Sequence, residues 1–279
     1  MIPLQLTSFI ANSGPTIYIA PLDIFSIKHI AITNAIFYGW ICSLILIVFL
    51  IMIARKLTIK PKAGLVQIVE YSVTFISNLV ESSFNDKSRG HKYIPFFVTL
   101  FFFILLNNWL GLIPGVGSAI TFHHYPLLRP FTADFNATLA AGLVTMTYVY
   151  GASIREVGLR AYIGHFFIGS PLNPLYLIIG LVEFLTDLTR VLSLSIRLFL
   201  NITVGEIIIA VFAYLGHVAA PLTTTPFVML ELFVGALQAY IFVILSVSYL
   251  ANNVNNITGQ QNLTKKSIPE TMKLQSETM

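Results

Sequence analysis

Charged side chains are scarce in this sequence of 279 residues. Asp, Glu, Lys and Arg make up 10% of it, whereas 56% of the residues are hydrophobic. A soluble globular domain carries about 25% charged residues, so this chain lacks the polar side chains needed to cover a water-facing surface. The composition therefore excludes a water-soluble globular protein and indicates a protein embedded in a membrane.

Cysteine is almost absent as well. Cys42 is the sole cysteine and lies inside the first long apolar stretch, so a disulfide within the chain is excluded. The N-terminus lacks the basic segment and the cleavage site of a signal peptide, which predicts that this stretch is kept as an anchor. The net charge of +4 comes from short loops, so it indicates orientation in a membrane and no binding of nucleic acid.

Long apolar stretches, by contrast, are abundant. A membrane-spanning helix needs about 20 largely apolar residues. The segment over 136–153 is rich in small residues and suits packing against other helices. Another segment, 61–85, has apolar residues at three- and four-residue steps, which predicts an amphipathic helix on the bilayer surface or packed on the bundle. The stretches predicted to span are 31–54, 93–113, 136–153, 175–215 and 227–253.

This pattern predicts an all-α integral membrane protein with about five transmembrane helices and one amphipathic surface helix. We expect a single membrane domain over 1–279. It comprises an outer N-terminal segment (1–30), a helical membrane bundle (31–253) and a polar, poorly ordered tail (254–279).

The last two apolar stretches are longer than a vertical crossing requires. As one helix, 175–215 would extend about 60 Å, which is twice the hydrocarbon thickness of a bilayer. It contains no proline, so we expect one strongly tilted helix that forms a hairpin with the last stretch through a loop over 216–226. Lys and Arg number seven between positions 55 and 92 but are nearly absent from 114–135 and 216–226, which predicts the N-terminus outside and the C-terminus in the cytoplasm.

Ionisable side chains interrupt these last two stretches, and such residues are functional candidates because a bilayer penalises charge. Glu206 lies about 140° around the helix from Glu183, on another face. On the last helix, Glu231 and Gln238 are seven residues apart and share a face. One stripe of the helix over 175–215, within about 40° of Glu183, holds Glu183, Asp187, Arg190, Arg197 and Asn201.

Arg197 is expected to be the functional centre of a protein that moves protons across a bilayer. A guanidinium stays protonated, so it can attract a carboxylate or block passage but cannot relay a proton. Carboxylates can be tuned by burial to load and release protons. The arrangement therefore predicts two separate aqueous inlets, one at Glu183 and Asp187 and one at Glu206 and Glu231, with a positive barrier between them.

Structural roles remain open for several of these residues. Glu183, Asp187 and Arg190 could form an ion-pair cluster that only fixes the position of the helix. Glu206 and Glu231 could simply hydrogen-bond neighbouring helices. The same holds for three asparagines that suit interhelical hydrogen bonds as much as channel lining, namely Asn107, Asn108 and Asn201.

Four blocks of the sequence resemble, in order, those of subunit a of F-type ATP synthases. SLSIRLFLNITVGE over 193–206 resembles the family signature with its arginine, asparagine and Gly-Glu pair, and LQAYIFVILSVSYL over 237–250 resembles the family's final helix. NWLGLIPG over 108–115 and PFTADFNATL over 130–139 match earlier blocks. The resemblance spans most of the chain.

The resemblance implies a proton-translocating stator subunit with no ATP site, cofactor or metal of its own. It implies a bacterial plasma membrane, or an equivalent energy-transducing membrane, as the location. The implied partners are a ring of small two-helix proteolipid subunits, peripheral-stalk subunits, the rest of the ATP synthase complex and the lipid bilayer.

The resemblance also assigns roles. The family's essential arginine corresponds to Arg197, with Asn201 and Gln238 as polar residues facing the proteolipid ring. The outer half-channel pair corresponds to Glu206 and Glu231. Asn107 and Asn108 are further candidates for the outer half-channel, and Glu183, Ser193 and Asp187 for the inner one. Relatives often have glycine where Leu200 stands, and often pair one acid with a histidine where this chain has two acids that should repel each other.

Two other classes of membrane protein were weighed. A stand-alone ion-coupled secondary transporter usually shows internal repeats and helices broken at mid-membrane, and no repeat is visible here. An intramembrane protease needs a buried Ser–His or paired-Asp arrangement, and no histidine lies deep in a predicted span. The transporter stays as the alternative, whereas the protease is nearly excluded.

Overall fold

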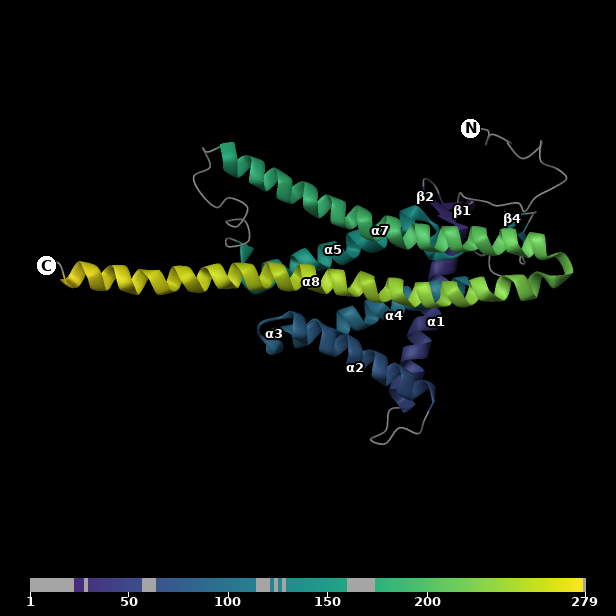
Figure 1. The fold of residues 1–279 in the computed structure, drawn as a ribbon, viewed down its shortest axis with the longest axis horizontal. Coiled ribbons are helices and arrows are strands. Elements are labelled where there is room, and N and C mark those ends of the chain that lie inside the picture. The colour runs from purple at the N-terminus through teal and green to yellow at the C-terminus, as the bar shows by residue number, and fades with distance from the viewer. Residues whose placement is uncertain are drawn as a thin grey trace. The chain divides into compact units, whose positions relative to one another are not determined.

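The computed structural model describes residues 23–27, 30–56, 64–113, 121–122, 125–126, 129–159 and 174–277. The described part is helical apart from two short antiparallel ribbons (Figure 1), so the expected all-α membrane fold is confirmed. In chain order the elements are β1 (Asp23–Ile27), β2 (Ile30–Thr33), α1 (Asn34–Lys56), α2 (Leu65–Ser83), α3 (Lys87–His91), α4 (Ile94–Gly111), β3 (Thr121–Phe122), β4 (Tyr125–Pro126), η1 (Phe131–Ala133), α5 (Phe135–Val157), α7 (Pro174–Gly216), η2 (His217–Ala219) and α8 (Ala220–Glu277).

Five of the described helices are long and apolar enough to cross a membrane, which agrees with the five predicted spans. The amphipathic helix predicted over 61–85 is present as α2 and is not among the five. The crossing stretches are Asn34–Arg55, Ile94–Gly111, Phe135–Val157, Leu185–Gly216 and Ala220–Asn256.

The start of the first span was predicted three residues too early. Residues Ile30–Thr33 pair with β1 as strand β2 instead of continuing the helix. The Thr33 hydroxyl accepts a hydrogen bond from the Ile36 backbone N–H at 3.4 Å. This N–H, three residues into the helix, is one that an N-cap side chain usually pairs with. The helix therefore begins at Asn34.

The hairpin loop predicted over 216–226 is wrong, because the turn between α7 and α8 occupies only His217–Ala219. His217 adopts a left-handed backbone conformation with φ of 46°, which lets the chain reverse sharply. The polar segment after the turn stays helical because its threonine hydroxyls donate to helix carbonyls. Thr224 Oγ1, for example, donates to the Ala220 oxygen at 2.8 Å.

The tail beyond Asn253 was predicted to be poorly ordered, and this is also wrong, since α8 continues to Glu277. Adding residues to an existing helix needs no new nucleus, so a polar segment can extend one. In α7, by contrast, the prediction of an unbroken helix over 175–215 is confirmed, because α7 runs for 43 residues without interruption.

The described contacts divide the chain into two compact units, and each of the five candidate spanning helices contributes to both. Unit 1 contains Met1–Phe49, Phe103–Thr138 and Ile196–Ala239, and unit 2 contains Leu50–Phe102, Leu139–Ser195 and Tyr240–Met279. The expectation of a single membrane domain stays a prediction, and its N-terminal segment, 1–30, lies mostly outside the described residues.

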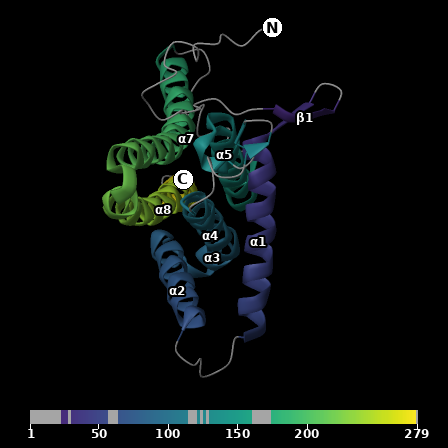
Figure 2. The same ribbon diagram turned by 90° about the vertical axis from the view of Figure 1, so that its right-hand side faces the viewer.

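In unit 1, the last part of α7 and the first part of α8 run antiparallel beside each other (Figures 1 and 2). The rings of Phe212 and Phe227 stack across this hairpin with centroids 4.0 Å apart. Thr223 Oγ1 also donates across it to the Phe212 carbonyl oxygen at 3.1 Å. These contacts fix the register in which acids on the two helices can meet.

In unit 2, close approach of small residues joins α5 to α7. A β-carbon on Gly142 would collide with the hydroxyl of Ser195, a fully buried residue. The segment between α3 and α4 is joined to α5 by Lys92 Nζ and Tyr93 OH, which each donate to the Glu156 carboxylate at 3.1 Å. The small-residue packing expected for the third span is therefore present.

Candidate functional site

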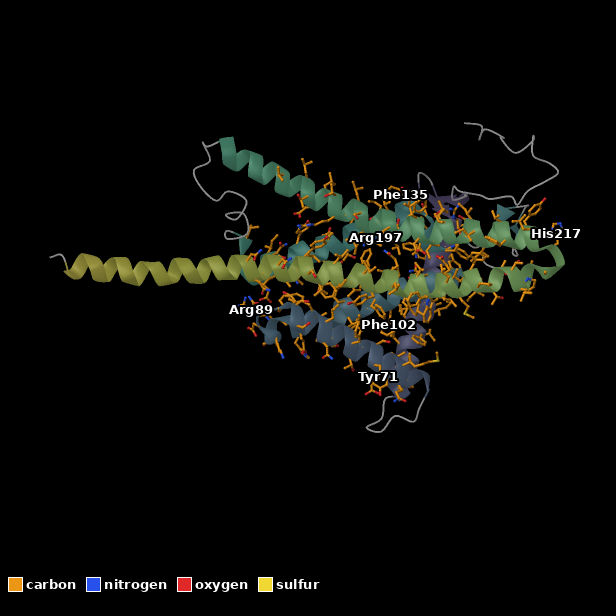
Figure 3. The ribbon with its side chains drawn as sticks, viewed as in Figure 1. Tyr71, Arg89, Phe102, Phe135, Arg197 and His217 are labelled. Carbon is orange, nitrogen blue, oxygen red and sulfur yellow. The ribbon has the colours of Figure 1, made fainter. Side chains whose placement is uncertain are left out.

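Arg197 lies on α7 (Figure 3), and its side chain is exposed. At 100° per residue, four exposed apolar side chains fall within about 60° of it. They are Leu200, Val204, Ile208 and Val211. Leu194, Leu198 and Ile202 lie about 60°, 100° and 140° around the helix from Arg197, to one side, and are almost completely buried. The face with Arg197 is thus the one that the rest of unit 1 leaves uncovered.

The guanidinium of Arg197 has no ion-pair partner among the described residues. The other arginine of α7 differs in this respect, because Arg190 Nη1 donates to Asp187 Oδ1 at 2.7 Å. The Arg190 guanidinium also lies 4.4 Å from the centroid of the Tyr249 ring, within the range of a cation–π contact. One arginine of the helix is therefore compensated within the chain, whereas Arg197 presents its charge outward.

Glu231 is the most deeply buried acid of the hairpin, with 5% of its surface exposed. Its carboxylate rests against the bare α-carbon of Gly205, where a β-carbon would overlap the carboxyl group. Glu206 is the residue after Gly205 in the sequence. It is half-buried and lies on the side of α7 opposite Arg197. Unit 1 therefore brings together the two acids that the sequence proposed as a pair.

Asn107 and Asn108 lie near the end of α4 and are buried in the same unit. Asn108 Nδ2 donates to the Gly235 carbonyl oxygen at 3.1 Å, and Trp109 Nε1 donates to the Leu232 carbonyl oxygen at 3.0 Å. Asn107 Nδ2 donates to Phe103 O of its own helix at 2.8 Å. Asn108 thus attaches α4 to α8, whereas Asn107 bonds within its own helix.

Unit 1 also contains a set of buried polar atoms without a hydrogen-bond partner among the described protein atoms. No such atom occurs in the described part of unit 2. A polar group in a membrane protein that lacks a partner is costly unless it lines a water-filled space. We call the side chains that carry these atoms the buried polar cluster, namely Asn107, Asn108, Thr132, Asn201, Thr203, Glu231 and Gln238.

The inner candidates are arranged differently. The Glu183 side chain lies outside the described residues, Ser193 is exposed on α7, and Asp187 is tied to Arg190. The ion-pair alternative thus describes the observed geometry of Asp187 and Arg190. Among the inner candidates whose side chains are described, Asp187 pairs with Arg190 and Ser193 is exposed.

Sequence reasoning missed three contributors to this region: Gly205, Thr203 and Arg129. Gly205 gave a weak signal because it stands in the Gly-Glu pair of the signature block. Thr203 gave none. Arg129 did carry a signal, because it is the lone Lys or Arg between positions 114 and 135 and stands directly before a proline.

Comparisons with known proteins agree with this architecture. Residues 36–251 match the family described as ATP synthase A chain. ATP synthase subunit a of Moorella thermoacetica is 31% identical over 85% of this chain and 98% of that protein. The subunit a of Oceanobacillus iheyensis is 31% identical over 84% of this chain and 95% of that protein. That of Anaeromyxobacter dehalogenans is 32% identical over 85% of this chain, but the match spans 60% of its own length.

Proposed function

Because the chain belongs to the ATP synthase A chain family of multi-pass membrane proteins, we propose that it is the proton-translocating stator subunit of a rotary F-type ATP synthase. The observation that carries the mechanism is the exposed guanidinium of Arg197 on an unbroken helix, among mostly apolar exposed side chains. The family match favours this function over the stand-alone transporter.

The apolar face around Arg197 is the surface proposed to meet the proteolipid ring. A permanent charge on an apolar face is costly in a bilayer unless an opposite charge reaches it. A carboxylate in the middle of each ring subunit supplies that charge at every step of rotation. Because a guanidinium does not release its proton, Arg197 attracts the ionised carboxylate and blocks direct passage of protons. Asn201 and Gln238 are proposed to face the ring beside it.

The buried polar cluster supports an outer half-channel at Glu206 and Glu231, with Asn107 and Asn108 along it. Polar atoms without protein partners are the places where water molecules bind inside a protein. A proton entering along such waters reaches a carboxylate of the ring, which then becomes neutral and can turn into the lipid.

The inner half-channel is proposed at Glu183 and Ser193, with Asp187 beside it. A ring carboxylate arriving there after nearly a full turn loses its proton to water on the cytoplasmic side. The pair of Asp187 with Arg190 adds a fixed cation seven residues before Arg197 on the same face. In this scheme the N-terminus lies outside, the C-terminus lies in the cytoplasm, and peripheral-stalk subunits hold the chain still in a bacterial plasma membrane.

Disulfide cross-linking in the complete complex tests the proposed ring surface. In a Cys42→Ala background, cysteine replaces Leu200, Val204 or Ile208 on the exposed face, and a second cysteine is placed on the carboxylate-bearing helix of the ring subunit. We expect cross-links from these three positions. Leu198→Cys and Ile202→Cys, on the buried face, serve as matched controls and should give none. Cross-links from the buried pair alone would contradict the proposed surface.

Gly205→Ala is expected to lower ATP-driven proton pumping roughly tenfold or more, because the added methyl group must displace the carboxylate of Glu231. Pumping is followed with a pH-sensitive dye in membrane vesicles that contain the assembled complex. Gly151→Ala is the control, since nothing lies within 4 Å of a β-carbon at that helical position. Equal pumping by the two variants would show that proton transport does not depend on the position of the Glu231 carboxylate.

A further inference from the structure

Helix α7 carries two arginines, Arg190 and Arg197, on nearly the same side. Seven residues of an α-helix turn the chain by about 700°, so the two positions differ by about 20° around the axis and by roughly 10 Å along it. Two uncompensated guanidinium groups at this spacing would give an ionised carboxylate two attractive sites on one helix instead of one. The surroundings of the two arginines therefore matter for any anion that moves past them.

Arg190 is compensated from two sides. Its Nη1 donates to Asp187 Oδ1 at 2.7 Å, which is a short, charge-assisted hydrogen bond within α7. Its guanidinium also lies 4.4 Å from the centroid of the Tyr249 ring of α8. The Arg190 side chain is 33% exposed and that of Asp187 18% exposed, so water weakens the pair only in part. The pair as a whole carries no net charge.

Arg197 lacks this compensation. Its side chain is exposed, and it has no ion-pair partner among the described residues. Leu200 and Val204, the exposed side chains nearest to it toward the end of α7, are apolar. The same helix thus holds one arginine that is neutralised within the chain and one that is open to a charge from outside it.

Asp187 and Arg190 also differ in what each becomes when the other is removed. A carboxyl group without its cation can take up a proton and become neutral, whereas a guanidinium stays charged. Removal of Asp187 therefore leaves a permanent positive charge, for which the ring of Tyr249 offers only a weaker attraction than a carboxylate does. The neutrality of this part of α7 depends on the carboxylate of Asp187.

We propose that Asp187 acts as the counter-ion of Arg190 and exchanges no transported proton. By neutralising Arg190 it prevents a second site that would hold a ring carboxylate, so that Arg197 alone attracts it. Asp187 is a positioning residue in this role, because it acts on the ring through Arg190. The inference rests on the proposed function, and it narrows the inner half-channel to Glu183 and Ser193.

The test removes the two members of the pair singly and together in the complete ATP synthase complex. The variants are Asp187→Asn, Arg190→Gln and the two combined, with Asp187→Glu as the conservative replacement. ATP-driven proton pumping and ATP hydrolysis are measured in vesicles with equal amounts of assembled complex. The temperature at which the detergent-solubilised complex dissociates is recorded as a measure of stability.

Asp86→Asn is the matched control. Asp86 also pairs with an arginine three residues later, Arg89, at 3.6 Å, but this pair lies at α3, outside the candidate spans. The side chain of Asp86 caps α3 by accepting a hydrogen bond from the Ser88 N–H, and asparagine caps a helix equally well. Loss of an Asp–Arg contact away from the proposed ring surface should change none of the readouts.

We expect Asp187→Asn to lower pumping about tenfold, which corresponds to an added attraction of one carboxylate by one partly screened cation. ATP hydrolysis should fall in proportion, because the held carboxylate slows the ring and no proton leak is opened. Arg190→Gln should stay within about twofold of the wild type, and its addition to Asp187→Asn should restore pumping to that level. Asp187→Glu keeps the carboxylate and should pump normally.

The double variant separates this proposal from two other roles for Asp187. If Asp187 carries the transported proton, the double variant pumps as poorly as Asp187→Asn. If the pair only stabilises the fold, Arg190→Gln lowers pumping and the dissociation temperature as much as Asp187→Asn does. Either result would overturn the proposal, and so would normal pumping by Asp187→Asn. The double variant remains decisive where Asp187→Asn alone assembles poorly, because poor pumping without both members contradicts the proposal.

The proposed function fails in a different way. If Arg197→Ala, measured alongside, pumps normally, no ring carboxylate needs an arginine and the transport mechanism is wrong. The dissociation temperatures of the four forms, wild type included, still report whether Asp187 and Arg190 stabilise each other.

Discussion

ATP-driven proton pumping is expected to fall at least about 100-fold when Arg197 is replaced by alanine, which is the scale of losing a charge that stabilises the reacting group. Arg197 has no ion-pair partner among the described residues, and most of the exposed side chains around it are apolar. Removing this side chain should therefore change the stability of the folded chain little. The ring carboxylate, however, loses the opposite charge that attracts it. The block against direct proton passage is lost as well.

The measurement uses vesicles with equal amounts of assembled complex, and ATP hydrolysis is recorded beside pumping. Arg155→Ala is the control, since it removes the same side chain from an exposed position near the end of α5. Normal assembly with lost pumping supports a role in proton transfer. Undiminished pumping by Arg197→Ala contradicts the assigned role.

The membrane helices were predictable because their signal is local. An apolar stretch of about 20 residues is visible without knowing what it packs against. The absence of proline over 175–215 was enough to predict α7 as one helix. The turn at His217–Ala219 was missed because prolines and threonines usually indicate a loop. Here the threonine hydroxyls bond to helix carbonyls and leave the helix intact.

Only those features of the candidate site that follow from residue spacing within a single helix could be predicted from the sequence. The spacing along α7 places Arg197 and Glu206 on different faces, and it allows the i,i+3 pair of Asp187 with Arg190. Gly205 and Arg129 depend on contacts between residues far apart in the sequence. Gly205 receives the carboxylate of Glu231 from α8, and the burial of Arg129 depends on contacts of its loop with α1 and α4. No periodicity along one segment reveals such contacts.

Glu231→Gln is expected to lower proton pumping about 100-fold while the complex assembles normally. Glutamine has nearly the same shape as glutamic acid, so the side chain can still occupy the space beside Gly205. An amide cannot release and rebind a proton as a carboxyl group does, so a group that must load and unload a proton at each step is lost. Pumping and the dissociation temperature of the complex are the two measurements.

Glu206→Gln is the informative comparison, because the two acids lie in the same unit but differ in burial: Glu206 is half-buried on α7 and Glu231 is buried on α8. Removing the charge of Glu231 relieves repulsion between the two acids and should not destabilise the complex. If Glu231→Gln pumps normally while Glu206→Gln stops pumping in a stable complex, Glu206 and not Glu231 exchanges the transported proton.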